Sequence, residues 1–260
     1  IVQCDGTGNL TQHNGWLAAH AGLIAEDVCN STATISFDLV KETKLCGLTG
    51  TSLYRFTITD ACGNSATDEA SFIIVDTLPP MIVGGADMEM EECNNPLSGN
   101  YPEFDFWLTN HAGASATDIC GGYSWSNNYN PNNWETRCGN TRSVDVTFYV
   151  TDICGNVDSI THTFSIGDVT PPTFTNCPSP PVIVDAPAGW CSAFANFAAI
   201  SATDNCSTVT ITQIDKTGYT SGSLFPVGTT ILMYEAADAC GNKDTCTLKI
   251  IVNDFHTPPT

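Results

Sequence analysis

Basic residues are scarce in this chain of 260 residues, which has 8 Lys and Arg against 28 Asp and Glu and a formal net charge of −20. Binding to nucleic acid without regard to sequence depends on cationic side chains that neutralise phosphates, so this composition excludes it. Adsorption to an anionic lipid surface needs the same charges and is not expected. The acidity then has two explanations, which are a solvated, repulsive surface or sites for divalent cations.

Long hydrophobic runs and the common catalytic motifs are also missing. No apolar run approaches the roughly 20 residues of a membrane-spanning helix, so we expect no membrane insertion. The chain has no His-Glu-x-x-His, no Gly-x-Ser-x-Gly, no phosphate-binding loop and no dinucleotide fingerprint. Carboxylates are abundant enough for a glycosidase, but the repeated ones stand beside cysteines, which suits a scaffold better. We therefore predict that the protein is not an enzyme.

Cysteine, in contrast, is plentiful, with 13 residues. No two cysteines have the Cys-x-x-Cys spacing that structural zinc sites commonly use. Regularly spaced cysteines at this density favour disulfides formed in an oxidising compartment. We therefore expect an extracellular, disulfide-stapled protein.

A five-residue pattern, Asp-x-Cys-Gly-Asn, occurs at residues 60–64, 152–156 and 238–242, with its cysteines 92 and 86 residues apart. Each copy follows a run that alternates apolar and polar residues, which indicates a turn after a β-strand. A pattern with this period predicts three tandem repeats of about 90 residues, which is near the usual size of a domain.

Segments ending in Pro-Pro separate the repeats, at 75–80, 167–172 and 253–259. Pro-Pro lacks backbone donors and favours an extended conformation, so these linkers should be short and semi-rigid. The chain has no initiator Met, and we expect it to be a piece of a longer array. We place an N-terminally truncated repeat 1 at residues 1–77, repeat 2 at 78–169, repeat 3 at 170–256 and the start of a next repeat at 257–260.

Short strand patterns and turns rich in Gly and Asn, in units of this length, are typical of immunoglobulin-like β-sandwiches. The predicted fold is all-β, a rod-like tandem array of three such modules stapled by disulfides. A Trp-Leu-x-x-His segment shared by residues 16–20 and 107–111 should insert one or two helical turns before a strand.

The sandwich geometry predicts a set of disulfides within the repeats. The loops after the second and sixth strands lie at one pole, and the cysteines there are separated by 33, 34 and 34 residues. Cys191 has no assigned partner, so it is either free or part of a permuted pairing. The predicted pairs are Cys29–Cys62, Cys120–Cys154 and Cys206–Cys240 at this pole, Cys4–Cys46 and Cys93–Cys138 at the opposite pole, and Cys177–Cys246 in repeat 3.

The same pole gathers carboxylates and amides, and the preceding linker brings another Asp to it. Calcium prefers several such oxygen ligands, and neighbouring carboxylates repel each other unless a cation or proton intervenes. Each Asp could instead accept hydrogen bonds from local backbone N–H groups, so both roles remain open. The candidate ligands are Asp76, Asp118, Asp152 and Asn156 before repeat 2, Asp168, Asp204, Asp238 and Asn242 before repeat 3, and an incomplete set of Asp27, Asp60 and Asn64 in repeat 1.

Aromatic residues of repeat 2 offer a different hypothesis. Tyr123, Trp125 and Trp134 could stack on sugar rings at the surface, or they could fill the core and pair across strands. The first role would suit a carbohydrate-binding protein.

Repeat 3 combines several motifs in a fixed order, which are Cys177-Pro178, Cys191, Ala202-Thr203-Asp204-Asn205-Cys206, Phe225-Pro226-Val227-Gly228-Thr229-Thr230, Asp238-Ala239-Cys240-Gly241-Asn242 and Cys246. With these residues, repeat 3 resembles a hyalin-repeat (HYR) module. Repeats 1 and 2, which lack the Phe-Pro-Val-Gly element, resemble the related Cys-rich immunoglobulin-like repeats of Bacteroidetes surface proteins, including gliding-motility adhesins. This resemblance implies display at the cell surface in association with the outer membrane, export by the type IX system and adhesion through long filaments or stalks.

The expected function is therefore structural and adhesive. The chain would be a segment of a long, secreted bacterial surface protein, spacing and stiffening a stalk or filament with interdomain calcium. Its partners would be neighbouring repeats, with surface polysaccharide or other adhesin copies as further candidates. Two alternatives remain, which are a carbohydrate-binding or accessory module of a secreted hydrolase and a subunit of a self-assembling extracellular filament.

Overall fold

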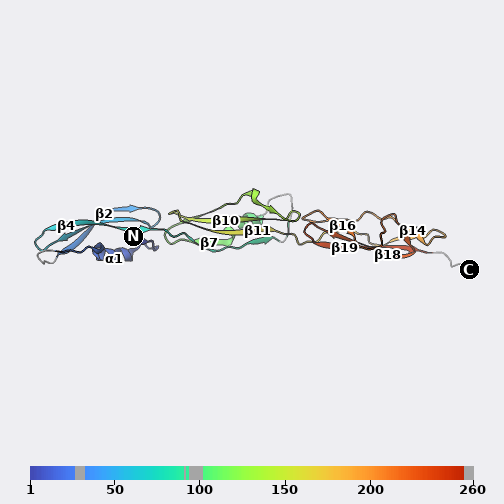
Figure 1. The fold of residues 1–260 in the computed structure, drawn as a ribbon, viewed down its shortest axis with the longest axis horizontal. Coiled ribbons are helices and arrows are strands. Elements are labelled where there is room, and N and C mark those ends of the chain that lie inside the picture. Colours follow the sequence, from blue (N-terminus) through green and yellow to red (C-terminus); the bar gives the residue numbers. More distant parts are fainter. Residues whose placement is uncertain (27–32, 91, 94–101, 255–260) are drawn as a thin grey trace. The chain divides into compact units, whose positions relative to one another are not determined.

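The computed structural model describes residues 1–26, 33–90, 92–93 and 102–254 (Figure 1). β-Strands and turns make up most of this structure, with a few short helices, which confirms the all-β prediction. Asp27, Cys29 and the predicted start of a next repeat at 257–260 lie outside the described residues. Within the described residues, no helix is long and apolar enough to cross a membrane.

The chain divides into two compact units. One consists of residues 1–86, 106–129 and 146–162, and the other of residues 87–105, 130–145 and 163–260. The boundary falls inside repeat 2, so each unit contains one of the two segments where consecutive repeats meet. Each sheet draws its strands from a single predicted repeat. The repeat boundaries themselves stay a prediction.

Repeat 1 is built on one four-stranded sheet with the order β1-β4-β3-β2, in which β1 is parallel to β4 and the other pairs are antiparallel. A helical segment follows β1, as the Trp-Leu-x-x-His pattern predicts, and Trp16 packs edge-on against the buried Phe56, with 5.8 Å between ring centroids. The elements are β1 (Val2–Gln3), α1 (Leu10–Ala18), η1 (His20–Gly22), β2 (Thr34–Lys44), β3 (Gly50–Thr59) and β4 (Ser65–Val75).

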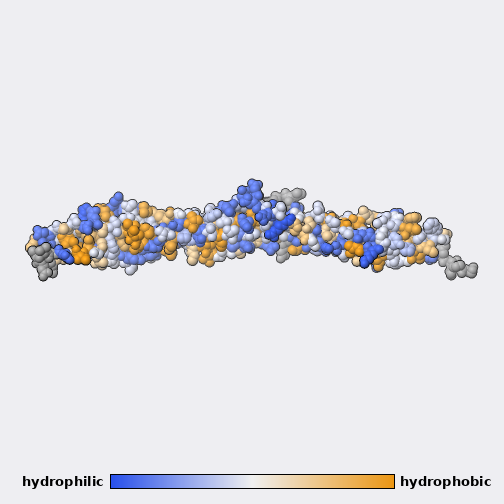
Figure 2. All heavy atoms as spheres, viewed as in Figure 1, coloured by the Kyte–Doolittle hydropathy of each residue, from blue (hydrophilic) through white to orange (hydrophobic). Residues whose placement is uncertain are grey.

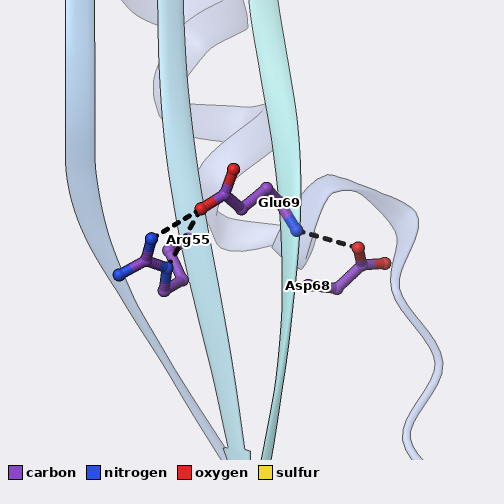
Figure 3. A network of polar contacts seen from close by, with 3 residues as sticks. All are labelled: Arg55, Asp68 and Glu69. Atoms are coloured by element: carbon purple, nitrogen blue, oxygen red, sulfur yellow. Dashed lines mark hydrogen bonds and ion pairs between the residues drawn. The ribbon is translucent and has the colours of Figure 1, made fainter.

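The exposed face of this sheet carries a cross-strand ion pair. Arg55 on β3 lies opposite Glu69 on β4, and its Nη2 is 2.7 Å from Glu69 Oε1 (Figure 3). Both side chains are about half exposed, so the pair contributes little to stability. On the face drawn in Figure 2, hydrophobic side chains form small patches among hydrophilic ones.

Repeat 2 has a main sheet with the order β6-β11-β10-β8, with β9 added on β10, and a second sheet of β5 and β7. Alternate residues of β10 (Val144, Val146, Phe148 and Val150) are at most 2% exposed, as the period-two pattern predicts. The elements are β5 (Met81–Gly84), β6 (Met88–Met90), α2 (Pro102–Thr109), η2 (His111–Gly113), β7 (Ala114–Thr117), β8 (Tyr123–Asn127), η3 (Pro131–Asn133), β9 (Glu135–Thr136), β10 (Arg142–Asp152) and β11 (Val157–Ile166).

Repeat 3 repeats this plan with a β13-β19-β18-β16 sheet facing two small pairs, β12-β15 and β14-β17. The core between them includes Phe225, Leu232, Leu248 and Ile250, all with 0% exposure. The second strand, β13, runs parallel to the last strand, β19, in a sheet that antiparallel strands complete, which is an immunoglobulin-like arrangement. The elements are β12 (Thr173–Asn176), β13 (Val182–Asp185), β14 (Ser192–Phe194), β15 (Ser201–Thr203), β16 (Thr210–Gln213), β17 (Leu224–Pro226), β18 (Gly228–Ala237) and β19 (Lys243–Asn253).

Among the residues that the structure describes, five disulfides are present, and four of them join consecutive repeats rather than closing a repeat on itself. Their Cα–Cα distances are 5.0–5.8 Å. Only Cys177–Cys246, within repeat 3, matches the predicted pairing. The four bridges between repeats are Cys4–Cys120, Cys46–Cys154, Cys93–Cys206 and Cys138–Cys240.

The predictions of Cys4–Cys46, Cys93–Cys138, Cys120–Cys154 and Cys206–Cys240 are therefore wrong. The cysteines assigned to each pole do gather there, but each pole meets the neighbouring repeat, whose cysteines lie within bonding distance. Cys62 and Cys191 are exposed and have no partner among the described residues. Since Cys29 is not described, the predicted pair Cys29–Cys62 stays a prediction.

Candidate functional site

The three Asp-x-Cys-Gly-Asn turns share one hydrogen-bonded structure. In repeat 2, Asp152 Oδ1 accepts bonds from the backbone N–H groups of Cys154 at 2.8 Å and Asn156 at 2.9 Å, and Asp152 Oδ2 accepts from Asn156 Nδ2 at 2.8 Å. The turns at Asp60 and Asp238 repeat these bonds within 0.1 Å. The capping role proposed for these Asp residues is therefore present in all three repeats.

The hydrogen bonds also favour the charged forms of Asp60 and Asp152 by lowering the pKa of each. Burial raises the pKa of Asp152, but the bonds from the Asn156 side chain and the turn backbone outweigh it and lower that pKa. The side-chain bond from Asn64 is the main cause that lowers the pKa of Asp60. Each amide donates an N–H group to a carboxylate, so the Asn side chains help to position these acids, and their role as metal ligands stays a prediction.

The turn also receives the preceding linker. Asn156 Nδ2 donates to the backbone carbonyl of Asp76 at 3.3 Å, and Asn242 Nδ2 donates to that of Asp168 at 3.1 Å. This places the linker carboxylate beside the turn carboxylate, as the sequence predicts. We call the meeting point of repeats 1 and 2, around Gln3, Asp76 and Asp152, the first junction, and that of repeats 2 and 3, around Glu92, Asp168 and Asp238, the second junction.

At the first junction, two carboxylates approach each other. Oxygens of Asp76 and Asp152 lie within 4.8 Å, beside the sulfur of Cys154, which is bonded to Cys46. Asp76 Oδ1 accepts a bond from Gln3 Nε2 at 3.1 Å, while Asp76 Oδ2 is buried without a donor. Asp118, a predicted ligand, accepts the N–H of Cys120 at 2.9 Å and is not part of this close group.

At the second junction, three carboxylates converge. Oxygens of Asp168, Asp204 and Asp238 lie within 4.8 Å of one another, and Asp238 is only 8% exposed. Asp204 Oδ2 accepts the N–H groups of Cys206 and Ser207, both at 2.8 Å. Asp204 Oδ1 and Asp168 Oδ2 are buried and have no hydrogen-bond donor. Oxygens in that state are the ones a bound cation would satisfy.

Among the carboxylates of the second junction, Asp168 has a raised pKa. Burial, followed by the charges of Asp204, Asp238 and Glu92, raises its pKa to about 6 from an ordinary 3.8. At neutral pH this carboxylate is still ionised, so the repulsion persists unless a cation offsets it.

Glu92 belongs to this site and was missed by the sequence reasoning. Its carboxylate lies within 4.8 Å of that of Asp168 and accepts hydrogen bonds from the Thr170 hydroxyl and from Asn205 Nδ2, the latter at 2.9 Å. These side-chain bonds are the main causes that lower its pKa. The available signal was position, since Glu92 precedes Cys93 as Gln3 precedes Cys4, and Gln3 likewise accepts a bond from the linker hydroxyl of Thr77.

A second contact accompanies the disulfides at each junction. The turn before strand β3 has the sequence Cys-Gly-x-Thr, and its Leu48 N–H donates to the carbonyl of Cys120 in the next repeat at 3.1 Å. The turn before β10 does the same through Asn140 and the carbonyl of Cys206, at 3.2 Å. Gly47 (φ 56°) has no room for a side chain, because a Cβ there would collide with that Cys120 carbonyl.

The aromatic candidates in repeat 2 differ in their surroundings. Trp134 packs against Phe104 at 5.1 Å between ring centroids, and the Arg142 guanidinium lies 4.5 Å above its ring. Trp125 stacks on His111 at 4.4 Å, while Tyr123 is 42% exposed. Their role in glycan contact stays a prediction.

The relatives of this chain were found by sequence and by structure. The family model named HYR domain matches residues 167–252, which supports the resemblance of repeat 3. "Sushi, von Willebrand factor type A, EGF and pentraxin domain-containing protein 1" of Rattus norvegicus is 33% identical over 113 residues, which are 42% of this chain and 3% of that protein. Its Mus musculus counterpart is 32% identical over 113 residues, with the same coverage.

Solved structures that align with the chain include cadherin ectodomains. The protocadherin gammaB7 EC3-6 cis-dimer structure aligns with a TM-score of 0.30 and 13% identity over 78% of this chain and 58% of that chain. Mouse cadherin-23 EC22-24 aligns with a TM-score of 0.28 and 14% identity over 89% of each chain. These scores are too low to support an argument about this protein. The family model matches an HYR domain in residues 167–252, and neither it nor the relatives indicate an enzyme family.

Proposed function

We propose that this chain is a segment of an extracellular, adhesion-type repeat protein, in which calcium and paired disulfides hold consecutive repeats together. The observation that carries the proposal is the second junction. There, three Asp carboxylates converge and two of their buried oxygens lack a donor, beside two disulfides that join the same two repeats.

The arrangement of disulfides between consecutive repeats supports a mechanical role. Consecutive repeats are joined by the linker and by two bridges whose cysteines are 102 to 116 residues apart in sequence. Three connections restrict bending and twisting more than a linker alone, and force applied along the chain divides among them. A segment that must transmit load without unfolding benefits from this arrangement.

The carboxylates support a calcium ion as the further element. Asp168, Asp204 and Asp238 are the residues we propose to hold it at the second junction, and Asp76 and Asp152 at the first. Calcium accepts hard oxygen ligands in flexible geometry and tolerates water in the remaining positions, whereas magnesium demands a near-ideal octahedron. A bound cation would offset the repulsion that now raises the pKa of Asp168.

Calcium titration of the full chain tests this proposal. Calorimetry and thermal melting should show saturable calcium binding and a rise in Tm of several degrees over chelated protein, with a smaller effect of magnesium. Asp238→Asn should abolish binding at the second junction, because Asn can still accept the two backbone bonds of the turn but loses the charge and the bond from Asn242 Nδ2. Glu69→Gln, which removes an exposed carboxylate that pairs with Arg55 and belongs to neither group of junction carboxylates, is the control (Figure 3).

The proposal of calcium fails if chelation changes neither Tm nor heat of binding. It also fails if Glu69→Gln weakens calcium binding as much as Asp238→Asn, since that result would indicate general attraction to an acidic surface. Neither outcome would contradict the disulfides that join consecutive repeats.

We also propose a more specific cellular setting, which follows the resemblance of repeats 1 and 2 to Bacteroidetes surface repeats. It comprises a gliding-motility or related adhesin, exported by the type IX system, associated with the outer membrane and arranged as a stalk or filament. The relatives in Rattus norvegicus and Mus musculus are animal proteins, so the bacterial setting rests on the resemblance of repeats 1 and 2. Immunolabelling of intact cells of the source organism, with and without the secretion system, tests this setting, and labelling that does not depend on that system contradicts it.

A further inference from the structure

A cavity of about 220 Å³ opens at the first junction, beside the disulfide between Cys4 and Cys120. Sites for small organic ligands commonly enclose roughly 300–1,000 Å³, so this cavity has room for one amino-acid side chain rather than for such a ligand. We call it the junction pocket and define it by six of the residues that line it, which are Gln3, Asp76, Leu78, Met81, Asp118 and Ile119.

The walls of the junction pocket are apolar and open to solvent. Leu78, Met81 and Ile119 are 58%, 61% and 68% exposed. Single exposed apolar side chains are common, but three that line one cavity form a surface that another molecule can cover. The second junction does not repeat this surface, because the corresponding positions there hold the polar residues Thr170, Thr173 and Asn205.

The polar residues of the second junction bond to one another. Glu92 accepts hydrogen bonds from the Thr170 hydroxyl and from Asn205 Nδ2. Leu78 and Ile119, which replace these two residues at the first junction, have no side-chain donors, and Gln3 replaces Glu92. The same place in the fold therefore holds an internal network of hydrogen bonds at one junction and an exposed apolar pocket at the other.

Two carboxylates give the junction pocket an acidic side. Asp118 accepts the N–H of Cys120 with one oxygen, at 2.9 Å. Asp76 accepts a bond from Gln3 with Oδ1, while its Oδ2 is buried without a donor. Among the described residues that line the pocket there is no Lys, Arg or His. A ligand that combines an aliphatic stem with a positive charge complements both the walls and the acids.

We propose that the junction pocket binds a lysine side chain of a partner polypeptide. The stem would lie against Leu78, Met81 and Ile119, and the ammonium would donate to Asp76 and Asp118. An ammonium is a compact charge with three donors that two carboxylates can share, whereas the planar arginine fork pairs best with a single carboxylate. The exposed walls favour a polypeptide over a free amine, since residues that flank the lysine would cover them.

The inference goes beyond the proposed function and does not rest on calcium. Because calcium would compete for Asp76, binding is measured in chelator on the full chain, by methyl NMR. The probe is the peptide acetyl-Gly-Leu-Lys-Leu-Gly-amide, and the methyl signals of Met81 and Ile119 should shift saturably. Those of Thr170 and Thr173, at the second junction, should not move. A peptide with norleucine in place of lysine keeps the stem without the charge and should bind at least about tenfold more weakly.

Variants separate the contributions of charge and walls. Asp118→Asn can still accept the N–H of Cys120, and it should weaken binding at least about fivefold because it loses the charge. The double variant Met81→Thr/Ile119→Asn copies the second junction and should weaken binding about tenfold, because it removes apolar contact area. Val83→Thr is the matched control, since Val83 is an exposed apolar residue of the same strand, β5, that does not line the pocket. Melting curves show that each variant is folded.

Several results would overturn the proposal. One is the absence of saturable binding, and another is equal affinity for the norleucine peptide, which would make the pocket a site for apolar side chains. Putrescine that binds as tightly as the lysine peptide would show that a free amine suffices. Equal shifts at Thr170 and Thr173, or an equal loss of affinity in Val83→Thr, would indicate general attraction to an acidic surface.

Discussion

The two junctions have the same arrangement of disulfides and differ in charge. Both have one bridge from the cysteine after Gln3 or Glu92 and one from a Cys-Gly-x-Thr turn. The first junction brings two carboxylates together beside the neutral Gln3, and the second brings three together beside the acidic Glu92. The repeated disulfides thus fix where the repeats meet, while the neighbouring side chains set how strongly each junction attracts a cation.

The largest expected effect tests whether the two junctions share the same arrangement of disulfides. The double variants Cys46→Ser/Cys154→Ser and Cys138→Ser/Cys240→Ser should each lower the free energy of unfolding by about 2–5 kcal/mol, because each removes a bridge that closes a loop of roughly 100 residues. Denaturant titration measures both. Similar losses at the two junctions support a common plan, and a loss at one alone would break the comparison.

Peptide mapping without reduction provides the direct check. It should recover Cys46 linked to Cys154 and Cys138 linked to Cys240. Fragments that link Cys120 to Cys154, within repeat 2, would contradict the plan.

Much of the fold could be predicted from the sequence, but the partners of the cysteines could not. Alternation in β10 and β19 predicts strands whichever repeat they contact, and Asp152 accepts the turn bonds that its position implies. Cysteine spacing is different, because in a tandem repeat the spacing recurs regularly both for pairs within a repeat and for pairs between neighbouring repeats. The recurring separation of 34 residues between Cys120 and Cys154 therefore could not exclude a bond from Cys154 to Cys46, 108 residues away.

The carboxylates of the second junction could also be predicted only in part. Asp168, Asp204 and Asp238 recur in register, so the sequence brings them to one pole. Glu92 has no acidic counterpart in repeat 1, where Gln3 precedes the cysteine, and only the structure shows that both residues contact the linker.

The glycine turns at the junctions should give the next largest effect. Gly47→Ala should cost about 2–3 kcal/mol, since a Cβ would collide with the Cys120 carbonyl in addition to the strain of positive φ. Gly63→Ala is the matched control, because it has positive φ but nothing within 4 Å of its Cβ. Equal losses in Tm for the two variants would show that the junction contact adds nothing beyond backbone strain.

The charge of the second junction should appear as a pH dependence in chelated protein. The pKa of Asp168, about 6, exceeds its ordinary 3.8, so between these values the folded state holds a proton that the unfolded chain has lost. Stability should therefore fall as pH rises through this window, by roughly 1–2 kcal/mol in a partly solvated site. Urea midpoints at pH 5 and pH 7.5 measure it.

The same pair of measurements on variants assigns the effect. Asp168→Asn should reduce the difference between pH 5 and pH 7.5, and Asp76→Asn, the counterpart at the first junction, should retain it. Calcium should reverse the trend, because it binds the ionised carboxylates and is displaced by protons. An unchanged difference in Asp168→Asn would place the titrating group elsewhere.

The smallest expected effect exchanges the residues that distinguish the junctions. Glu92→Gln should weaken calcium binding at the second junction, and Gln3→Glu should strengthen it at the first, each by roughly threefold to tenfold, since one neighbouring charge is removed or added. Calorimetry on the single variants and the double variant follows both sites. Glu89→Gln removes an exposed charge from β6, which ends two residues before Glu92, and should leave calcium binding unchanged. If Glu89→Gln matches Glu92→Gln, the difference between the junctions reflects overall surface charge and not the residue before the cysteine.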